Sequence, residues 1–452
     1  MIVFRGGSVV TADGIQKRDL YIDGGKIVPP GEAEQVVDVS GCLLFPGFID
    51  SHTHLDMPVS GTVTADSFPS GTAAAVAGGT TVVIDFATQD RGHTLAEALD
   101  VWHTRADGRC ACDYGFHMAV TDWNERTKKE LPRMAEAGIT SFKGYMAYDN
   151  LRLDDEDIRA FAAAAGEQGA FVGMHCELGG MVNSGVAALL AAGHTAPKYH
   201  PLSRPNEVEA LAVRRFLELA RMARGLPWIV HLSTREGLAE IDAARELGQS
   251  VLVETCPQYL TLTDEVYARP DFEGAKFVCS PPIRSAADRD ALWQAVEDGR
   301  VDILSTDHCS FNFAGQKEIG RGDFSKIPNG LPGLETRPAL LWTAGVAAGR
   351  ITAADMCRLL SAAPAKAMGL WGKKGALEPG FDADIVVWDP AYRGTIRAAD
   401  QETQCDYSPW EGFTVTGRAR EVWLRGVKAA EDGRCLRKGG GQYLYRKPPI
   451  IN

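Results

Sequence analysis

Eight short segments rich in β-branched and aromatic residues recur along the chain. They lie at residues 43–54, 80–86, 113–120, 140–148, 171–177, 228–233, 250–256 and 301–308. Longer stretches rich in Ala, Glu and Arg separate most of them, including residues 154–166, 207–223, 236–247 and 286–298. Strand–helix units in such a succession predict an α/β fold, a (β/α)8 barrel of the TIM type. The spacing between the units is irregular, so we expect a distorted barrel.

The two ends of the chain carry a different pattern, in which short strands alternate with tight turns. Asp-Gly pairs at positions 13–14 and 23–24 are typical hairpin turns. Strand-like segments return near the C-terminus, at residues 383–389, 413–415 and 420–424. Neither end is long enough to bury a core alone, so we expect both to combine in a small β-sandwich domain beside the barrel. This prediction assigns residues 1–48 and 371–435 to the β domain, 49–370 to the barrel and 436–452 to a basic, flexible tail.

The composition limits the partners and the compartment. A net charge of −12 over 452 residues argues against a nucleic-acid partner, which needs a basic surface. No apolar run approaches the roughly 20 residues that span a bilayer, and the N-terminus lacks the features of a signal peptide. The ten cysteines are scattered without a CxxC pair, which is typical of reduced thiols in a cytosolic chain. We therefore expect a cytoplasmic protein with neither a nucleic-acid nor a membrane partner.

Residues that can bind metal ions fall at the ends of the predicted strands. His52 and His54 end the first strand and, being two residues apart, point to the same face. Two converging imidazoles are typical ligands of a divalent transition metal. The later strands end close to Lys143, Tyr148, His175, His231 and Asp307. The C-terminal ends of barrel strands meet at one mouth, and core histidines would not all fall there. The pattern therefore predicts a metal-dependent active site.

The remaining histidines do not follow this pattern. Four of them lie in predicted loops or helices, where we expect solvated or supporting roles: His93, His103, His194 and His200. His117 lies in the middle of a strand and is expected to be a hydrogen-bonded core residue. His308 follows Asp307 directly and should face away from the mouth, because successive strand residues alternate.

Lys143 is unusual among these residues, because a free ammonium group would repel a metal ion. One interpretation is a structural lysine that pairs with Asp307 or another carboxylate. The other is a lysine carbamylated by CO₂, which turns the cation into a carboxylate that can bridge two metal ions. The spacing of the residues leaves both interpretations open.

Several further segments, spread over nearly the whole chain, carry a family pattern. They are residues 46–56, 61–66, 78–81, 141–143, 146–148, 200–205, 279–282, 305–309, 327–330 and 383–384. With these segments the chain resembles the amidohydrolase superfamily and, within it, the hydantoinase/dihydropyrimidinase family.

The resemblance implies a centre with two divalent metal ions, for which zinc is the usual metal in the family. The implied ligands are His52, His54 and Asp307 for the more buried ion, and His175 and His231 for the second. Lys143, carboxylated at Nζ to N6-carboxylysine, would bridge the two ions together with a hydroxide. Two ions about 3.5–4 Å apart can lower the pKa of a shared water towards roughly 7.

The implied activity is the hydrolysis of a cyclic amide, of the D-hydantoinase/dihydropyrimidinase type. The bridging hydroxide would attack a ring carbonyl of a hydantoin or dihydropyrimidine and open the ring to an N-carbamoyl amino acid. Asp307 would take the proton of the hydroxide and pass it to the leaving nitrogen. Tyr148 would donate a hydrogen bond to the developing oxyanion. Ser280 and Asn329 would hold the cyclic ureide through backbone groups, and the resemblance also implies a homotetramer.

Other members of the superfamily remain as alternatives. Dihydroorotases usually carry an Arg two residues after the second His of the pair, where this chain has Asp56, so an anionic ring is disfavoured. Allantoinases usually lack the equivalent of Tyr148, but an allantoinase or another cyclic-ureide hydrolase stays the main alternative. A non-enzymatic, dihydropyrimidinase-like interaction protein is a remote one, because every metal-ligand position is filled here. Asp149 and Ser310 depart from the family pattern, which leaves the ring substituent and its stereochemistry open.

Overall fold

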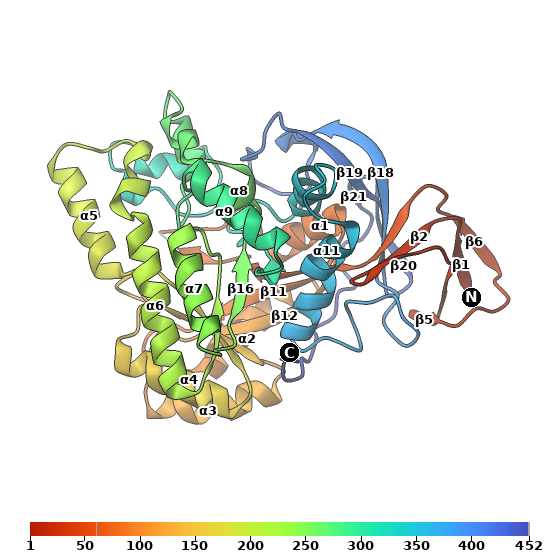
Figure 1. Cartoon of the computed structure of the whole chain (residues 1–452), viewed down its shortest axis with the longest axis horizontal. Coiled ribbons are helices and arrows are strands. Elements are labelled where there is room, and N and C mark those ends of the chain that lie inside the picture. Colours follow the sequence, from red (N-terminus) through yellow and green to blue (C-terminus); the bar gives the residue numbers. More distant parts are fainter. Residues whose placement is uncertain (60, 451–452) are drawn as a thin grey trace.

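A parallel barrel forms the centre of the computed structural model, which describes residues 1–59 and 61–450 (Figure 1). Eight strands lie side by side in the order in which they occur along the chain. They are β8 (Phe48–Thr53), β11 (Thr80–Thr88), β12 (Asp113–Ala119), β13 (Ser141–Tyr145), β14 (Phe171–His175), β15 (Leu226–Ile229), β16 (Leu252–Thr255) and β17 (Ile303–Leu304). A parallel bridge between Thr53 and His308 joins the two edges of this sheet. The predicted distorted barrel is confirmed, with register irregularities between β8 and β11 and a last strand, β17, of only two residues.

Helices cover the outside of the barrel. The longer ones are α1 (Phe68–Gly78), α2 (Leu95–Ala106), α3 (Glu125–Glu136), α4 (Asp155–Glu167), α5 (Gly179–Ala191), α6 (Asn206–Ala223), α7 (Arg235–Glu246) and α9 (Ala286–Glu297). Five of them begin at a side chain that accepts a hydrogen bond from a backbone N–H of the first turn. These N-caps are Thr94, Asn124, Asp154, Thr234 and Ser285. In the described residues, no helix combines the length and the hydropathy needed to cross a bilayer.

Shorter helical pieces fill the loops and follow the barrel. The α-helical ones are α8 (Pro257–Thr261), α10 (Arg337–Leu341), α11 (Ala353–Cys357) and α12 (Ala363–Ala367). The π-helical turns η7 (Trp342–Val346) and η8 (Arg358–Ala362) continue α10 and α11. The 3-10 turns are η1 (Pro197–Tyr199), η2 (Pro201–Ser203), η3 (Asp264–Ala268), η4 (Glu273–Phe277), η5 (Lys317–Gly320), η6 (Phe324–Lys326) and η9 (Ala398–Asp400). The buried Arg337 of α10 donates to the carbonyls of Ile49 and Leu304, and so ties the first barrel strand to the last.

Strands from both ends of the chain form a β domain beside the barrel. One sheet has the order β5-β4-β1-β6, with β1 (Ile2–Arg5), β4 (Leu20–Asp23), β5 (Lys26–Val28) and β6 (Gln35–Asp38). The other has the order β21-β20-β19-β18-β7-β2-β3, with β2 (Ser8–Thr11), β3 (Gly14–Gln16), β7 (Leu43–Pro46), β18 (Ile385–Thr395), β19 (Thr414–Leu424), β20 (Val427–Glu431) and β21 (Arg434–Cys435). Phe4 and Leu20 of the first sheet pack with Leu44, Ile385 and Trp423 of the second in one apolar core. The predicted sandwich of both termini is confirmed, and Figure 1 shows its red and blue strands side by side.

The first predicted barrel strand, residues 43–54, is divided between two sheets. Its first half is β7, which pairs with β18 in the β domain, whereas β8 pairs with β11 in the barrel. Gly47 lies at the crossing, where a Cβ atom would overlap the side chain of Thr81. β7 and the first residues of β8, Phe48 and Ile49, form one apolar run across the crossing, so the apolar pattern alone does not reveal the division.

The C-terminal tail packs against the barrel. The backbone N–H of Leu444 donates to the carbonyl of Tyr114 across 2.8 Å, and Leu444 is buried. Arg446 is also buried, and its guanidinium donates to Ser141 Oγ at 2.8 Å and to the carbonyl of Phe116. The expectation of a flexible tail is therefore wrong for these residues, because they bind backbone and side-chain acceptors of β12 and β13.

A hairpin of two short strands, β9 (Pro58–Val59) and β10 (Thr62–Val63), follows β8 and leads into α1. It lies in the loop after the first barrel strand. That loop therefore borders the C-terminal mouth of the barrel, where the predicted metal ligands lie.

Candidate metal centre and substrate site

Three of the predicted ligands meet at the C-terminal mouth of the barrel. His52 lies in β8, His54 directly follows it, and Asp307 comes shortly after β17. Asp307 Oδ1 lies 3.1 Å from Nε2 of His52 and 3.1 Å from Nε2 of His54. One ligand atom from each of the three residues lies within 4.8 Å of the others. Two imidazoles and a carboxylate in this arrangement fit a divalent metal ion.

A second pair of histidines faces the first group. His175 ends β14 and His231 follows β15, and Nδ1 of His175 lies 3.1 Å from Nε2 of His231. The ring centroids of His52 and His231 are 5.5 Å apart. Lys143 extends from β13, and its Nζ lies 3.0 Å from Nε2 of His52. All six residues predicted as ligands therefore come together at this end of the barrel.

Lys143 is buried without a carboxylate partner. Its Nζ lies 4.4 Å from the centroid of the Phe86 ring, and it forms no ion pair with a carboxylate of the described residues. Burial lowers the pKa of this lysine. An unpaired ammonium group in such a place is costly, so the arrangement does not support a structural ion pair with Asp307.

Two buried glutamates orient the histidines from behind, and neither was predicted from the sequence. Glu254 Oε1 accepts from Nδ1–H of His52 at 2.7 Å and from the backbone N–H of His231 at 3.1 Å. Glu177 Oε2 accepts from Nε2–H of His175 at 2.8 Å. Such bonds set the tautomer of each ring and leave the opposite nitrogen free to bind a metal ion. The sequence did contain a signal for Glu254, namely a charged residue within an apolar strand. A carboxylate is buried in such a place only if it has a partner.

The burial of the histidines also sets their charge. Burial lowers the pKa of His54 to about 4 and lowers the pKa values of His175 and His231 below the usual range. The pKa of His52 is raised instead: burial opposes the charged ring, but the carboxylates around it outweigh burial. Neutral imidazoles keep the lone pair that a metal ion requires.

Three residues of the site have a left-handed backbone conformation. The φ angles are 67° at Tyr148, 40° at His231 and 52° at Asp307. For residues other than glycine this conformation costs on the order of 1–3 kcal/mol each. It persists only where the surrounding contacts hold it, and such residues gather at functional sites.

Tyr148 lies beside the second pair of histidines. Its ring centroid is 5.2 Å from that of His175, and its hydroxyl reaches the side chains of Ser280 and Arg204. Burial raises the pKa of Tyr148 to about 12, so the hydroxyl keeps its proton at neutral pH. No role was predicted for Arg204 from the sequence. This residue is buried, pairs with Glu177 at 3.1 Å and donates a hydrogen bond to Ser280 Oγ. It therefore links the tyrosine to the carboxylate behind His175.

Ser280 and Asn329 lie on two loops that one buried lysine joins. Lys317 Nζ donates to three backbone carbonyls beside them, those of Val278 at 2.7 Å, Pro328 at 2.6 Å and Gly330 at 2.8 Å. Asn329 Oδ1 is buried and has no hydrogen-bond partner among the described residues. The two predicted substrate-binding residues are thus held in place together.

Comparison with known proteins identifies the family. The model of the Amidohydrolase family matches residues 43–428. The chain belongs to the amidohydrolase family. The D-hydantoinase of Streptomyces coelicolor is 45% identical over 98% of this chain and 97% of that protein, and the D-hydantoinase of Geobacillus stearothermophilus is 43% identical over 98% and 96%. The crystal structure of the dihydropyrimidinase of Brevibacillus agri has a TM-score of 0.97 at 41% identity, over 99% of each chain. The resemblance that the sequence motifs indicated is confirmed.

Two acidic residues that set this amidohydrolase apart serve as local partners. Asp56 Oδ2 accepts from the backbone N–H of Phe68 at 2.8 Å, at the start of α1. Asp149 pairs with Arg152 at 3.1 Å and accepts from Asn183 at 2.9 Å. Both carboxylates are therefore engaged by partners within the chain.

Two histidines outside the metal centre lie as predicted. His308 turns away from the mouth, and its Nε2–H donates to Asp66 Oδ2 across 3.1 Å. His117 is a core residue whose ring nitrogens bond to Ser141 Oγ at 2.6 Å and to the carbonyl of Ser51 at 2.9 Å. His308 and His117 thus stand apart from the four histidines that meet at the mouth of the barrel.

Proposed function

We propose that this amidohydrolase binds two divalent metal ions, opens hydantoin and dihydropyrimidine rings, and releases N-carbamoyl amino acids. The observation that carries the proposal is the meeting of His52, His54 and Asp307 opposite His175 and His231. Relatives named D-hydantoinase and dihydropyrimidinase, at 41–45% identity over nearly the whole chain, support the substrate class and a preference for the D-hand.

Zinc is the proposed metal, because neutral imidazoles with a carboxylate are ligands that Zn²⁺ prefers. Two such ions, when bound, would polarise the ring carbonyl and lower the pKa of a bound water to roughly 7. Lys143 would complete the ligand set as N6-carboxylysine: its Nζ bonds to the carbon of CO₂ and one proton leaves to solvent. A buried amine that faces His52 without a carboxylate partner supports this modification.

The chain's own residues can direct the proton transfers of ring opening. Water adds to the ring carbonyl carbon, the ring C–N bond breaks, and one proton of the water moves to the leaving nitrogen. The new carboxylic acid loses the other proton to solvent. Asp307 would carry the first proton from the water to the nitrogen. Tyr148 would donate to the oxygen on which negative charge develops, while the backbone at Ser280 and Asn329 holds the ring.

The proposal extends to the setting of the enzyme as a cytoplasmic homotetramer without nucleic-acid or membrane partners. The ten cysteines support a reducing compartment, since none of them forms a disulfide in the described residues. The family resemblance supports the tetramer.

A ring-opening assay tests the function. The purified, metal-loaded protein is offered hydantoin, 5-substituted hydantoins of each hand, dihydrouracil and allantoin, and the open product is measured. We expect N-carbamoyl amino acids from hydantoins of the D-hand and from dihydrouracil. Turnover of allantoin alone would instead identify an allantoinase. A metal-loaded protein that opens none of these rings would contradict the enzymatic proposal and leave the interaction-protein alternative.

Metal analysis tests the centre separately. We expect about two zinc-class ions per chain in the active protein. A fully active chain that holds at most one ion would refute the binuclear centre.

A further inference from the structure

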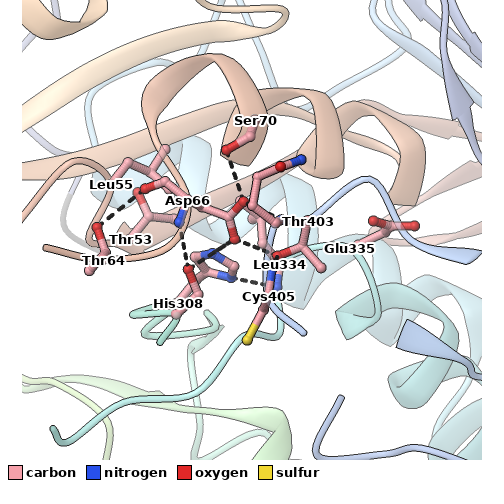
Figure 2. A network of polar contacts seen from close by, with 12 residues as sticks. Thr53, Leu55, Thr64, Asp66, Ser70, His308, Leu334, Glu335, Thr403 and Cys405 are labelled. Atoms are coloured by element: carbon pink, nitrogen blue, oxygen red, sulfur yellow. Dashed lines mark hydrogen bonds and ion pairs between the residues drawn. The ribbon is translucent and has the colours of Figure 1, made fainter. Parts of the chain in front are cut away.

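The Asp66 carboxylate accepts hydrogen bonds from separate parts of the chain. It precedes α1 and is fully buried. Its Oδ2 accepts from Nε2–H of His308 at 3.1 Å, from Oγ–H of Ser310 at 2.9 Å and from Oγ1–H of Thr403. Its Oδ1 accepts from Oγ–H of Ser70 and from the backbone N–H of Gln404, both at 2.9 Å. Figure 2 shows Asp66 among His308, Thr403 and Ser70.

The His308 ring is fixed through both of its nitrogens. Nδ1 accepts from the backbone N–H groups of Gly333 at 3.1 Å and Leu334 at 3.2 Å. The ring proton therefore lies on Nε2, which points at Asp66. Among the described residues, Asp66 is the only charged side chain that forms a hydrogen bond with this ring.

The backbone of His308 is fixed as well. Its carbonyl accepts from the backbone N–H of His54 at 2.8 Å, and its N–H donates to Thr306 Oγ1 at 3.1 Å. Asp307 lies between Thr306 and His308 with a φ of 52°. A residue in this conformation stays there only if its neighbours hold it. The contacts of His308 therefore hold the backbone of Asp307 from its C-terminal side.

Ser310 binds the same loop to Asp66 a second time. Its Oγ donates to Asp66 Oδ2 and accepts from the backbone N–H of Asp66 at 3.0 Å. Its carbonyl accepts from the backbone N–H of Ala65 at 2.8 Å. The segment of residues 307–310 is thus attached to residues 65–66 through both a side chain and the backbone.

We propose that Asp66 is a positioning residue for Asp307, which holds the loop of residues 307–310 through His308 and Ser310 and so directs the Asp307 carboxylate into the mouth. The proposal rests on the proposed function, in which Asp307 binds metal and carries a proton. Thr403 and Gln404 lie between β18 and β19, so the β domain shares in this support of the active site.

The Asp66→Asn variant tests the proposal. The amide keeps the size of the carboxylate, but one of its two polar atoms becomes a donor that faces other donors. We expect kcat to fall at least about tenfold with KM within about twofold of the wild type, as for groups that orient metal ligands. Metal should also pass more quickly to an added chelator at a temperature well below Tm.

Ser70→Ala is the matched control. It removes one hydrogen bond from the same carboxylate, but on Oδ1 and from α1, so it does not loosen the loop of Asp307. We expect a lower Tm with kcat and the rate of metal release within about twofold of the wild type. A loss of kcat in Ser70→Ala as large as that in Asp66→Asn would reduce Asp66 to a structural role and overturn the proposal.

A double-mutant comparison uses Ser310→Ala. Because this change is small, it can also test the proposal by itself if Asp66→Asn does not fold. Ser310→Ala alone should lower kcat severalfold and speed metal release. Combined with Asp66→Asn, it should add little, because both changes remove the same attachment. Unchanged kcat and metal release in both single variants would overturn the proposal. A wild-type protein that opens no ring would instead contradict the proposed function, while the metal-release rates would still test the positioning.

Discussion

Nδ1–H of His52 donates to Glu254 Oε1 across 2.7 Å, and both side chains are fully buried. The contact joins β8 to β16, which are separated by β17 in the closed barrel. It leaves Nε2 of His52 to face Asp307 and Lys143. His52, the predicted ligand that is most conspicuous in the sequence, therefore owes the orientation of its ring to a residue 202 positions away.

Glu254→Gln should weaken the metal centre. Glutamine keeps an acceptor oxygen for the ring of His52 but removes the negative charge that makes this bond strong. Loss of such a partner typically costs 10–100-fold in metal affinity or activity. We expect a loss in this range, measured as the metal retained after dialysis against a chelator. Glu421→Gln is the control, because Glu421 of β19 is also buried and accepts from Trp423 Nε1 at 3.0 Å, away from the centre. Equal metal retention in the two variants would contradict the role of Glu254.

Lys143→Ala should abolish activity and reduce bound metal, because the proposed bridging carboxylate would be lost. Short carboxylic acids such as propionate should restore part of the activity by taking the place of the carbamate. Lys317→Ala is a matched control, since Lys317 is another buried lysine, and in the described part of the chain its hydrogen bonds all go to backbone carbonyls. Any activity that it loses should not return on addition of propionate. An active, metal-replete Lys143→Ala protein would disprove the bridging role.

Tyr148→Phe should lower kcat with metal content unchanged. The hydroxyl is the proposed donor to the oxyanion, and one well-placed donor contributes on the order of 3 kcal/mol, or about a hundredfold in rate. Steady-state kinetics together with metal analysis measure both quantities. Tyr114→Phe is the control, because the hydroxyl of Tyr114 donates to Asp107 at 2.6 Å and takes no part in the mouth. If kcat stayed at the wild-type value in Tyr148→Phe, the oxyanion role would be wrong.

Glu335→Gln should change how stability depends on pH. Burial raises the pKa of Glu335 from 4.5 to about 8. Between about pH 4.5 and 8 the folded chain therefore holds a proton that the unfolded chain has released, so this group makes stability fall as pH rises. Thermal unfolding at pH 5.5 and pH 8 should show Tm of the wild type falling relative to Glu335→Gln.

Glu411→Gln is the control for this experiment. Glu335 accepts from the backbone N–H of Glu402 at 2.8 Å, and the exposed Glu411 accepts in the same way from Ala398 at 2.7 Å. A glutamine oxygen can keep either bond. The difference in Tm between the wild type and Glu411→Gln should stay nearly constant over the same pH range. A constant difference for Glu335→Gln as well would mean that its carboxylate does not titrate in this window.

Much of this protein follows from local patterns in its sequence. The succession of apolar segments and amphipathic stretches indicated the eight strands, because a strand and a helix each carry their own period of apolar residues. The positions of His52, His54, His175, His231 and Asp307 at strand ends then indicated one metal-binding mouth, since parallel strands of a barrel end at the same face. These inferences need only the order of the residues and the geometry of the fold.

Only the tertiary structure decided which distant residues support that mouth. Glu254 behind His52, Asp66 behind His308, and Arg446 beneath Ser141 each bond to a partner from another part of the chain. No local period records such a pairing, because a hydrogen bond depends on the final positions of two atoms and not on their separation in sequence. The division of residues 43–54 between two sheets is of the same kind, since one apolar run crosses the boundary and only the strand partners differ.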